Sequence, residues 1–197
     1  MQKSKEITAG TKEWADKNVN FVKGCSHNCR YCYAKKMATR FGRKTDENWK
    51  EMEIRQEIIN KKFRKNDGRI MIPSSHDLVP EEPFMSATIT ILENLLEAEN
   101  ELLITSKPHF KVIKMICDQF TQFKEQIQFR FTITSDDNEL LRFWEPGAPL
   151  FEDRVEALKY AHKKGFKTSI SIEPFLSDPV RIIEKIKKYV TESIWVG

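Results

Sequence analysis

The chain has 197 residues, of which 40% are apolar and 31% are charged, and its net charge is +4. This length and balance allow one domain with its own apolar core and exclude a disordered chain. No apolar run approaches the roughly 20 residues that a bilayer requires, so the composition also excludes a membrane-spanning protein.

Short apolar runs alternate along the chain with longer segments whose apolar residues recur at helical spacing. A long polar loop that contains residues 145–149 is expected before the helix at 152–164. In chain order the sequence predicts a strand at 19–22, helices at 34–41 and 47–63, a strand at 69–72, a helix at 84–99, a strand at 102–105, a helix around 112–120, a strand at 129–134, a helix at 152–164, a strand at 168–172, a helix at 179–189 and a strand at 194–196.

This alternation of strands and helices predicts a parallel sheet with helices outside it. A full eight-fold barrel takes about 250 residues, whereas this length fits about six strand-and-helix units. We therefore predict an α/β fold, an open, partial (β/α)6 TIM-like barrel, formed by a single domain over residues 1–197. The last apolar run ends at Gly197, where a strand should give way to a helix, which raises the question of truncation at the C-terminus.

Three of the four cysteines lie in one polar segment, residues 24–34, just after the first predicted strand. Cys25, Cys29 and Cys32 have the spacing C-x3-C-x2-C. In a parallel barrel this position belongs to the C-terminal face, where active sites lie. Thiolates are soft ligands that suit iron–sulfur clusters and zinc. A [4Fe–4S] cube held by three cysteines keeps one iron open for a cofactor or substrate.

Other readings of the cysteine segment are weighed against this one. A zinc site would add His27 to the three thiols. A c-type haem is excluded, because Tyr33 and not histidine follows Cys32. A redox dithiol at Cys29 and Cys32 would leave Cys25 unexplained.

The remaining cysteine and the start of the chain give information on the cellular compartment of the protein. Cys117 lies on an apolar helical face and is expected to be a core residue. Residues 1–6 contain no apolar signal core, which predicts a cytoplasmic protein. Thiols are normally reduced there, so ligand or core roles are favoured over disulfides.

With the aromatic Tyr31 one residue before Cys32, the segment resembles the radical S-adenosylmethionine (radical SAM) superfamily, whose motif is C-x3-C-x-Φ-C with an aromatic Φ. The order of strand, cysteine loop and helix fits that superfamily over nearly the whole chain. Residues 24–34, 74–77, 105–107, 144–154 and 172–174 are similar to its spore photoproduct lyase-like branch.

This resemblance implies a [4Fe–4S] cluster on Cys25, Cys29 and Cys32, with S-adenosylmethionine bound at the open iron. It further implies reductive cleavage to methionine and a 5′-deoxyadenosyl radical, which abstracts a hydrogen atom from a substrate. By position in the motif, Tyr31 is expected near the adenine. The photoproduct lyases also use a late cysteine as hydrogen donor, and nothing after Cys117 supplies one here.

Polar residues follow the predicted strands, whose ends converge at the mouth of a parallel barrel. The cofactor presents an ammonium, a carboxylate and a ribose diol. Ser75 or Asp77 is the candidate partner of the ammonium, and Lys107 that of the carboxylate. Ser135 and Glu173 are candidates for the ribose or the substrate, although ordinary turn and cap roles are the alternative for each residue. The complete set is Ser74, Ser75, Asp77, Ser106, Lys107, Thr134, Ser135 and Glu173.

Several residues near this mouth have two interpretations. Glu145 is expected to cover the site. Arg154 could reach the mouth from the start of its helix, but a surface ion pair is the expected role. Phe143 and Trp144 either form a lid or pack. His76 is either an acid–base group or part of a turn. The sequence assigns no catalytic residue beyond these candidates.

The charge is distributed unevenly, with 17 Lys and Arg against 8 Asp and Glu in residues 1–66. This excess predicts an acidic partner, either an electron donor such as flavodoxin or ferredoxin or a nucleic-acid or phosphorylated substrate, with a solvated surface as the alternative. A different class of function is a non-enzymatic zinc or Fe–S binding module that interacts with nucleic acid. The basic residues closest to the cysteines are Lys23, Arg30, Lys35, Lys36, Arg40, Arg43 and Lys44.

Overall fold

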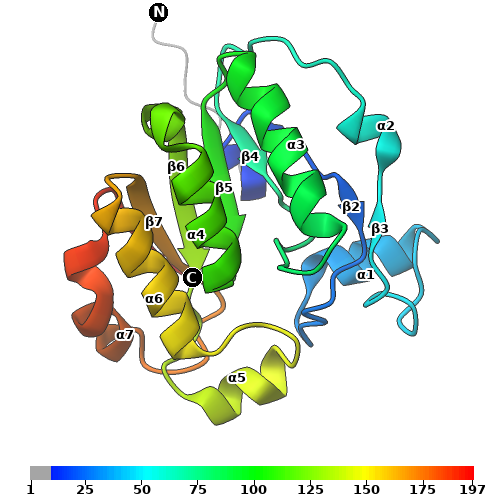
Figure 1. Ribbon diagram of the computed structural model, residues 1–197. Coiled ribbons are helices and arrows are strands. Elements are labelled where there is room, and N and C mark those ends of the chain that lie inside the picture. Colours follow the sequence, from blue (N-terminus) through cyan, green and yellow to red (C-terminus); the bar gives the residue numbers. More distant parts are fainter. Residues whose placement is uncertain (1–9) are drawn as a thin grey trace, which may run out of the picture.

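The computed structural model describes residues 10–197, which form a six-stranded parallel sheet with the strand order β1-β4-β5-β6-β7-β8 (Figure 1). The sheet has two edges, so the barrel is open, and the predicted partial (β/α)6 architecture is confirmed. The strands are β1 (Lys17–Asn18), β4 (Ile70–Ile72), β5 (Leu102–Ser106), β6 (Ile127–Thr132), β7 (Lys167–Ile172) and β8 (Ile194–Val196).

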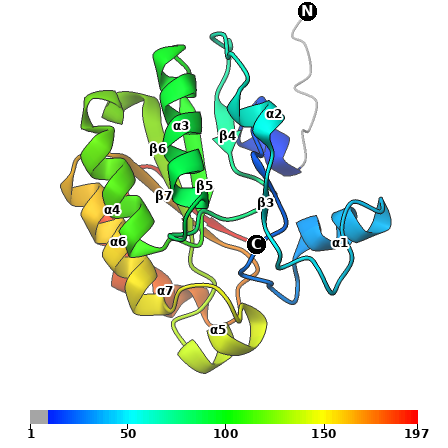
Figure 2. The same cartoon turned by 45° about the vertical axis from the view of Figure 1, so that its right-hand side comes forward.

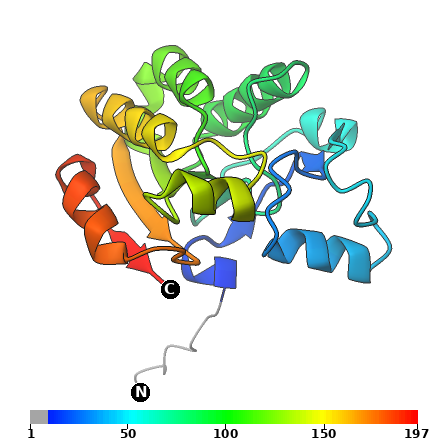
Figure 3. The same cartoon turned by 90° about the horizontal axis from the view of Figure 1, so that it is seen from below.

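The larger helices α3 (Phe84–Glu97), α4 (Phe110–Gln119), α6 (Phe151–Lys163) and α7 (Pro179–Ile186) cover the outer face of the curved sheet, as the view from below shows (Figure 3). Each follows a strand of the sheet, as a right-handed crossover between parallel strands requires. Within residues 10–197, no helix combines the length and apolar character needed to cross a membrane. Short 3-10 turns lie at Gly10–Glu13, Thr121–Gln126 and Lys187–Tyr189.

The two faces of the sheet differ in chemistry. On β6, Ile127, Phe129 and Phe131 are fully buried in the main core beneath the helices. Because side chains alternate along a strand, Gln128 and Arg130 point to the opposite, concave face. The apolar face therefore holds the fold together, while the concave face carries polar groups.

The first strand of the sheet is displaced from its prediction at 19–22. Residues 17–18 pair with β4, whereas β2 (Val22–Lys23) pairs antiparallel with β3 (Glu53–Ile54) in a separate ribbon. Figure 2 shows this ribbon and α1 (Tyr33–Arg40) to one side of the sheet. The cysteine loop therefore leaves from the ribbon and not from a strand of the main sheet.

The predicted helix at 47–63 is wrong, because only α2 (Gln56–Ile59) forms within it. The chain must turn back so that β3 can pair with β2, and the Arg55 amide then donates to the Phe21 carbonyl at 2.8 Å. Trp49 is 3% exposed and packs with Cys25 and Ala38. This tertiary pairing overrides the local helical pattern.

A helix also forms where a polar loop was expected. Helix α5 (Asn138–Trp144) begins at Asp137, whose Oδ1 accepts from the amides of Glu139 at 2.8 Å and Leu140 at 3.3 Å. Such an N-cap satisfies amide groups that have no partner within the helix. Leu141 is buried and anchors α5 to the main core.

Candidate active site

The three clustered cysteines lie on the loop between β2 and α1. The amide of Cys25 donates to the Trp49 carbonyl at 2.9 Å, which fixes the start of the loop. Cys25 and Cys29 are buried, Cys32 is half-buried, and all three are free thiols. Cys32 also caps α1, because its sulfur accepts from the Lys35 amide at 3.3 Å. Three soft donors on one short loop suit an iron–sulfur cluster.

The environment of the two buried thiols keeps them protonated without a metal. Burial, followed by the charge of Asp77, raises the pKa of Cys25 to about 12. Burial raises the pKa of Cys29 to about 11, although Lys107 acts in the opposite direction. A cluster would bind them as thiolates and release their protons. Within residues 10–197, the structure gathers no three His, Cys, Asp or Glu groups around a point that a single metal ion would occupy.

Glycine is required where the chain enters this loop. Gly24 has φ +82°, a left-handed conformation that side chains disfavour. A Cβ at this position would also lie 2.6 Å from the Trp49 carbonyl oxygen and would collide with the Glu51 carbonyl oxygen. The close approach of these two carbonyls orients the following residue, Cys25.

The segment after α5 packs directly on the cysteine loop. The Arg30 amide donates to the Trp144 carbonyl at 2.8 Å, and the Gly147 amide donates to the His27 carbonyl at 3.0 Å. The Arg30 guanidinium lies 4.2 Å from the centre of the Phe143 ring and donates to the Phe143 carbonyl. Phe143 and Trp144 therefore pack against this loop.

A buried carboxylate joins the aromatic residue of the cysteine motif to the barrel. Glu145 is 1% exposed and Arg154 is fully buried, and the two form an ion pair. The other Glu145 oxygen accepts from the Tyr31 hydroxyl and, at 2.8 Å, from the Thr134 hydroxyl. The predicted surface ion pair of Arg154 is thus wrong, since Arg154 shares the buried face of α6 with residues 157, 158 and 161.

Protonation in this group follows from its surroundings. Burial above all holds the pKa of Tyr31 above its usual range, so the phenol stays protonated and donates to Glu145. Burial alone would raise the pKa of Glu145, but the Lys107 and Arg154 cations outweigh it and lower that pKa. Glu145 therefore stays ionised at neutral pH.

Asp77 organises the ends of β4 and β5. Its Oδ1 accepts from the Leu78 amide at 2.9 Å and from the Ser106 hydroxyl, and its Oδ2 accepts from the Lys107 amide at 3.0 Å. His27 Nδ1 lies 3.2 Å from Asp77 Oδ2. Burial would raise the pKa of Asp77, but His27 and these donors hold it well below its usual range.

His27 is engaged away from the thiols. It is 1% exposed, and its Nε2 lies 2.9 Å from Nε2 of His109, while its other ring nitrogen faces Asp77. The zinc alternative needs this ring as a fourth ligand, whereas its Nε2 contacts His109 and its Nδ1 faces the Asp77 carboxylate. His76 is buried with its Nδ1 3.1 Å from the Asp77 carbonyl, and burial lowers its pKa to about 4.

Lys107 is the cation of the mouth. Its Nζ lies 5.5 Å from the centre of the Tyr31 ring. Although burial alone would lower the pKa of Lys107, Cys29 when ionised and the Glu145 and Asp77 carboxylates raise that pKa above its ordinary value. The ammonium therefore stays charged beside the cysteine loop.

The other candidate cofactor-binding residues lie less close to the cysteine loop or are engaged elsewhere. The Ser75 amide donates to Asn20 Oδ1 at 3.0 Å, and buried Ser135 accepts from the Asp137 amide at 2.9 Å. Glu173 is exposed at the end of β7. The structure thus brings Tyr31, Asp77 and Lys107 together with the thiols, and leaves Glu173 at the edge. The sequence interpretation did not foresee the roles of Asn20 and His109, which no motif marks; it placed Thr134 among the polar residues after the strands, without its bond to Glu145.

The basic residues near the loop differ in exposure and in whether they already form ion pairs. Lys44 is buried and paired with Glu53, and Lys35 lies 3.1 Å from Asp46. Lys36 and Arg40 are exposed on α1. Beside them, Tyr33 and Phe41 are 74% and 60% exposed, and the guanidinium groups of Arg40 and Arg43 lie 5.7 and 5.5 Å from the centre of the Phe41 ring.

Comparison with known sequences gives a family and two relatives. The model of the Radical SAM superfamily matches residues 19–190. An uncharacterized protein of Methanocaldococcus jannaschii is 30% identical over 166 residues, which cover 83% of the chain and 62% of that protein. An uncharacterized protein of Acidianus two-tailed virus is 26% identical over 196 residues, which cover 93% of the chain and 62% of that protein. The chain spans less than two thirds of the length of either relative.

Solved structures of spore photoproduct lyase mutants share the fold. One with dinucleoside spore photoproduct has a TM-score of 0.62 at 15% identity. Another, with AdoMet and dinucleoside spore photoproduct bound, has a TM-score of 0.60 at 16% identity. Both matches cover 87% of this chain and 51% of the lyase chain. At this identity the likeness concerns the fold alone.

Replacing Gly24 should disrupt the cysteine loop. We expect Gly24→Ala to lose most of its iron after anaerobic reconstitution, because a Cβ collides with two backbone carbonyls. Gly42→Ala is the matched control, since Gly42 has a similar φ of +64° with open space around it, and only backbone strain of about 1 kcal/mol applies. Equal iron content in the two variants would contradict the close-approach argument.

Removing the partner of Glu145 should destabilise the protein. Arg154→Met leaves a buried carboxylate unpaired and should lower the free energy of unfolding by about 3–5 kcal/mol in urea titrations. Adding Glu145→Gln should restore part of this loss. Arg181→Met, which removes an ion pair of a largely exposed side chain, should cost about 1 kcal/mol or less. A double variant less stable than Arg154→Met would refute this account.

Proposed function

Because the chain belongs to the radical SAM superfamily, whose cofactors are a [4Fe–4S] cluster and S-adenosylmethionine, we propose that it is a radical SAM enzyme with Cys25, Cys29 and Cys32 as cluster ligands. The observation that carries this proposal is the position of the three free thiols, on one polar loop beside a charged lysine and an oriented tyrosine. When bound, the reduced cluster supplies the electron that cleaves S-adenosylmethionine to methionine and a 5′-deoxyadenosyl radical.

The residues of the mouth have distinct proposed tasks in binding this cofactor. Lys107 keeps a positive charge where the cofactor carboxylate needs a partner. Tyr31 presents a ring to the adenine, and its hydroxyl bond to Glu145 fixes the orientation of that ring. Ser75 is the candidate for the ammonium, and Ser135 and Glu173 remain candidates for the ribose or the substrate.

Asp77 has a more indirect proposed role. Both of its oxygens already accept bonds from within the chain, so few acceptor positions remain for an ammonium. By holding the Lys107 amide and facing His27, it ties the end of β5 to the cysteine loop. It therefore orients the groups that contact the cofactor.

For the substrate we propose a chemical class and no individual compound. The solved lyase structures contain a dinucleoside photoproduct, and the first third of this chain is basic. Both observations favour a nucleic-acid or phosphorylated substrate, from which the radical takes a hydrogen atom. The free thiols suit the reducing conditions of the cytoplasm.

Cluster assembly and cofactor cleavage test the enzyme proposal. After anaerobic reconstitution the protein should contain about four irons per chain, and dithionite with S-adenosylmethionine should yield 5′-deoxyadenosine. Cys25→Ala, Cys29→Ala and Cys32→Ala should each abolish both, because the cube needs all three ligands. Cys117→Ala, which changes a core thiol on α4, is the control and should retain both. One zinc per chain without iron would instead support a non-enzymatic binding module.

We further propose that the exposed face of α1 docks an acidic electron donor of the flavodoxin or ferredoxin type. This helix begins directly after Cys32, so a carrier bound there would lie next to the cluster. Lys36, Arg40 and Arg43 supply positive charge, and the exposed Tyr33 and Phe41 supply apolar contact. Complementary charge mainly raises the association rate, and salt weakens the effect.

Charge reversal on α1 tests this surface. The double variant Lys36→Glu with Arg40→Glu should slow cluster reduction by reduced flavodoxin about tenfold at low salt, while dithionite-driven cleavage stays unchanged. Lys163→Glu, on the exposed side of α6, alters charge away from the cysteines and should have little effect. An equal slowing in the α6 variant, or none in either, would argue against docking on α1.

A further inference from the structure

The concave face of the sheet carries two arginines that form no ion pair with any carboxylate among residues 10–197. Arg69 lies directly before β4, and Arg130 lies in β6. Two positive charges next to each other in a poorly solvated place require a counter-ion. Glu173 attracts Arg130, but the two side chains form no ion pair among residues 10–197.

Strand register fixes where the Arg130 side chain lies. Arg130 is opposite Ser169 of β7, and its Nε donates to the Ser169 hydroxyl at 3.4 Å. Its guanidinium lies 4.6 Å from the centre of the Trp14 ring. The Trp14 ring in turn packs edge-on against Trp195 of β8, with the ring centres 5.9 Å apart. Arg130 is therefore held between the sheet and an indole on the concave side.

Two neighbouring donors in this group have no acceptor. Arg130 is 6% exposed, and its Nη1 is buried without a hydrogen-bond partner in the part of the chain that the structure describes. The same holds for Nε1 of Trp14. Buried polar groups are nearly always satisfied, and each exception requires an explanation. Here both unpaired atoms are donors, so the missing partner is an acceptor.

Arg69 reinforces the positive charge without supplying that acceptor. It donates to the Trp14 carbonyl through Nε at 3.1 Å and through Nη2 at 2.9 Å, and to the Gln128 side chain. It thereby holds Trp14 in place. Burial, and then the neighbouring charge of Arg69, lower the pKa of Arg130, as expected of a cation that lacks its counter-ion.

We propose that Arg130 and Trp14 form an oxyanion subsite on the concave face of the barrel, which takes a phosphate or carboxylate group of the substrate. A guanidinium is well suited to the recognition of such an anion, and the indole N–H adds a second unpaired donor. The assignment of the anion to the substrate rests on the proposed function, whereas the subsite itself rests on the geometry of Arg130 and Trp14.

The position of Arg130 indicates the extent of the substrate. Arg130 lies four residues before Thr134, whose hydroxyl bonds to Glu145 at the mouth. Four residues of extended strand correspond to about 13 Å. A substrate anchored by its anion at Arg130 would therefore extend along the concave face toward the cysteine loop, where the radical is formed.

Anion titration of the full-length protein tests the subsite directly. Inorganic phosphate and acetate are added in separate arms at constant ionic strength, with chloride as the balancing salt. The indole N–H resonance of Trp14, assigned with Trp14→Phe, should shift in a saturable manner with one or both oxyanions. Saturation by phosphate alone indicates a phosphorylated substrate, and saturation by acetate alone indicates a carboxylate.

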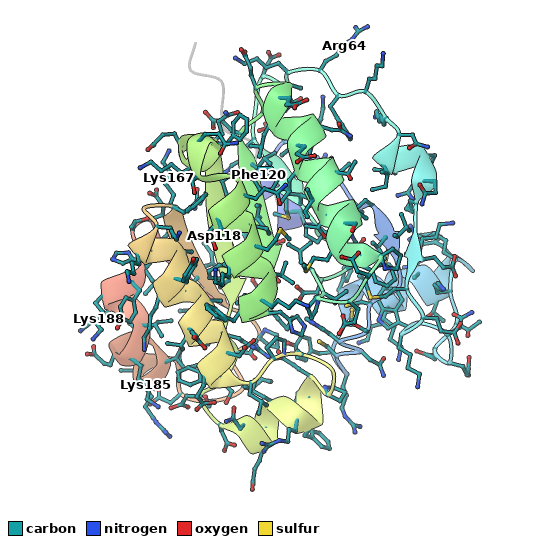
Figure 4. The ribbon with its side chains drawn as sticks, in the orientation of Figure 1. Arg64, Asp118, Phe120, Lys167, Lys185 and Lys188 are labelled. Atoms are coloured by element: carbon teal, nitrogen blue, oxygen red, sulfur yellow. The ribbon has the colours of Figure 1, made fainter. Side chains whose placement is uncertain are left out.

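Matched arginine variants supply the control. Arg130→Gln should weaken the binding of the responding anion at least about tenfold, because the unpaired Nη1 donor and the positive charge are lost together. Arg64→Gln makes the same charge change at an exposed arginine on the loop before β4, where the side chain points away from the molecule (Figure 4), and should leave affinity unchanged. No saturable shift in either arm, or equal affinity in Arg130→Gln and wild type, overturns the proposal.

Thermal unfolding covers the case in which Arg130→Gln folds poorly. The responding anion should raise the unfolding temperature of the wild type and of Arg64→Gln, since it binds the folded state. Arg130→Lys keeps the charge but lacks the planar guanidinium group, so the anion should raise its unfolding temperature less than that of the wild type. An increase equal to that of the wild type overturns the proposal. Neither measurement needs the cluster, so a failure of cofactor cleavage would reject the enzyme proposal while leaving the subsite standing.

Discussion

The contact between the cysteine loop and the barrel depends on one buried carboxylate, that of Glu145. It accepts from Tyr31 within the cysteine motif and from Thr134 after β6, and it pairs with Arg154 on α6. An isolated charge at this depth would be strongly destabilising, so the pair and the two hydroxyls must be present together. The aromatic residue of the motif is thereby fixed relative to strand ends that are distant in sequence.

Charge balance at the mouth explains why these groups occur together. Without a cluster, Lys107 and Arg154 offset the carboxylates of Asp77 and Glu145. A cluster held by thiolates adds negative charge beside Lys107, which favours the charged form of that lysine further. A lysine so placed can meet both the cluster and a carboxylate ligand, and its own position is held through the bond of its amide to Asp77.

The sequence predicted the parallel sheet and the cysteine loop because both depend on local patterns. Apolar runs marked β4 to β8, and the three cysteines with Tyr31 marked the loop. The wrong helix has a physical cause, namely a partner distant in sequence. Residues 47–63 have a helical pattern, yet the pairing of β3 with β2 takes precedence. Arg154 is charged and was expected at the surface, although its spacing from Ala157, Leu158 and Ala161 already placed it on the buried face of α6.

The two faces of the sheet have different roles: one stabilises the fold, and the other carries polar groups that can bind a ligand. Beneath the helices, alternate residues of β6 are apolar and need no partner beyond close packing. The opposite residues of the same strand are polar, and they include a guanidinium group with an unsatisfied donor. Methionine or leucine at that position would fill the space without any cost of charge burial. A protein that keeps arginine there accepts lower stability, and a ligand that supplies the missing acceptor would explain why.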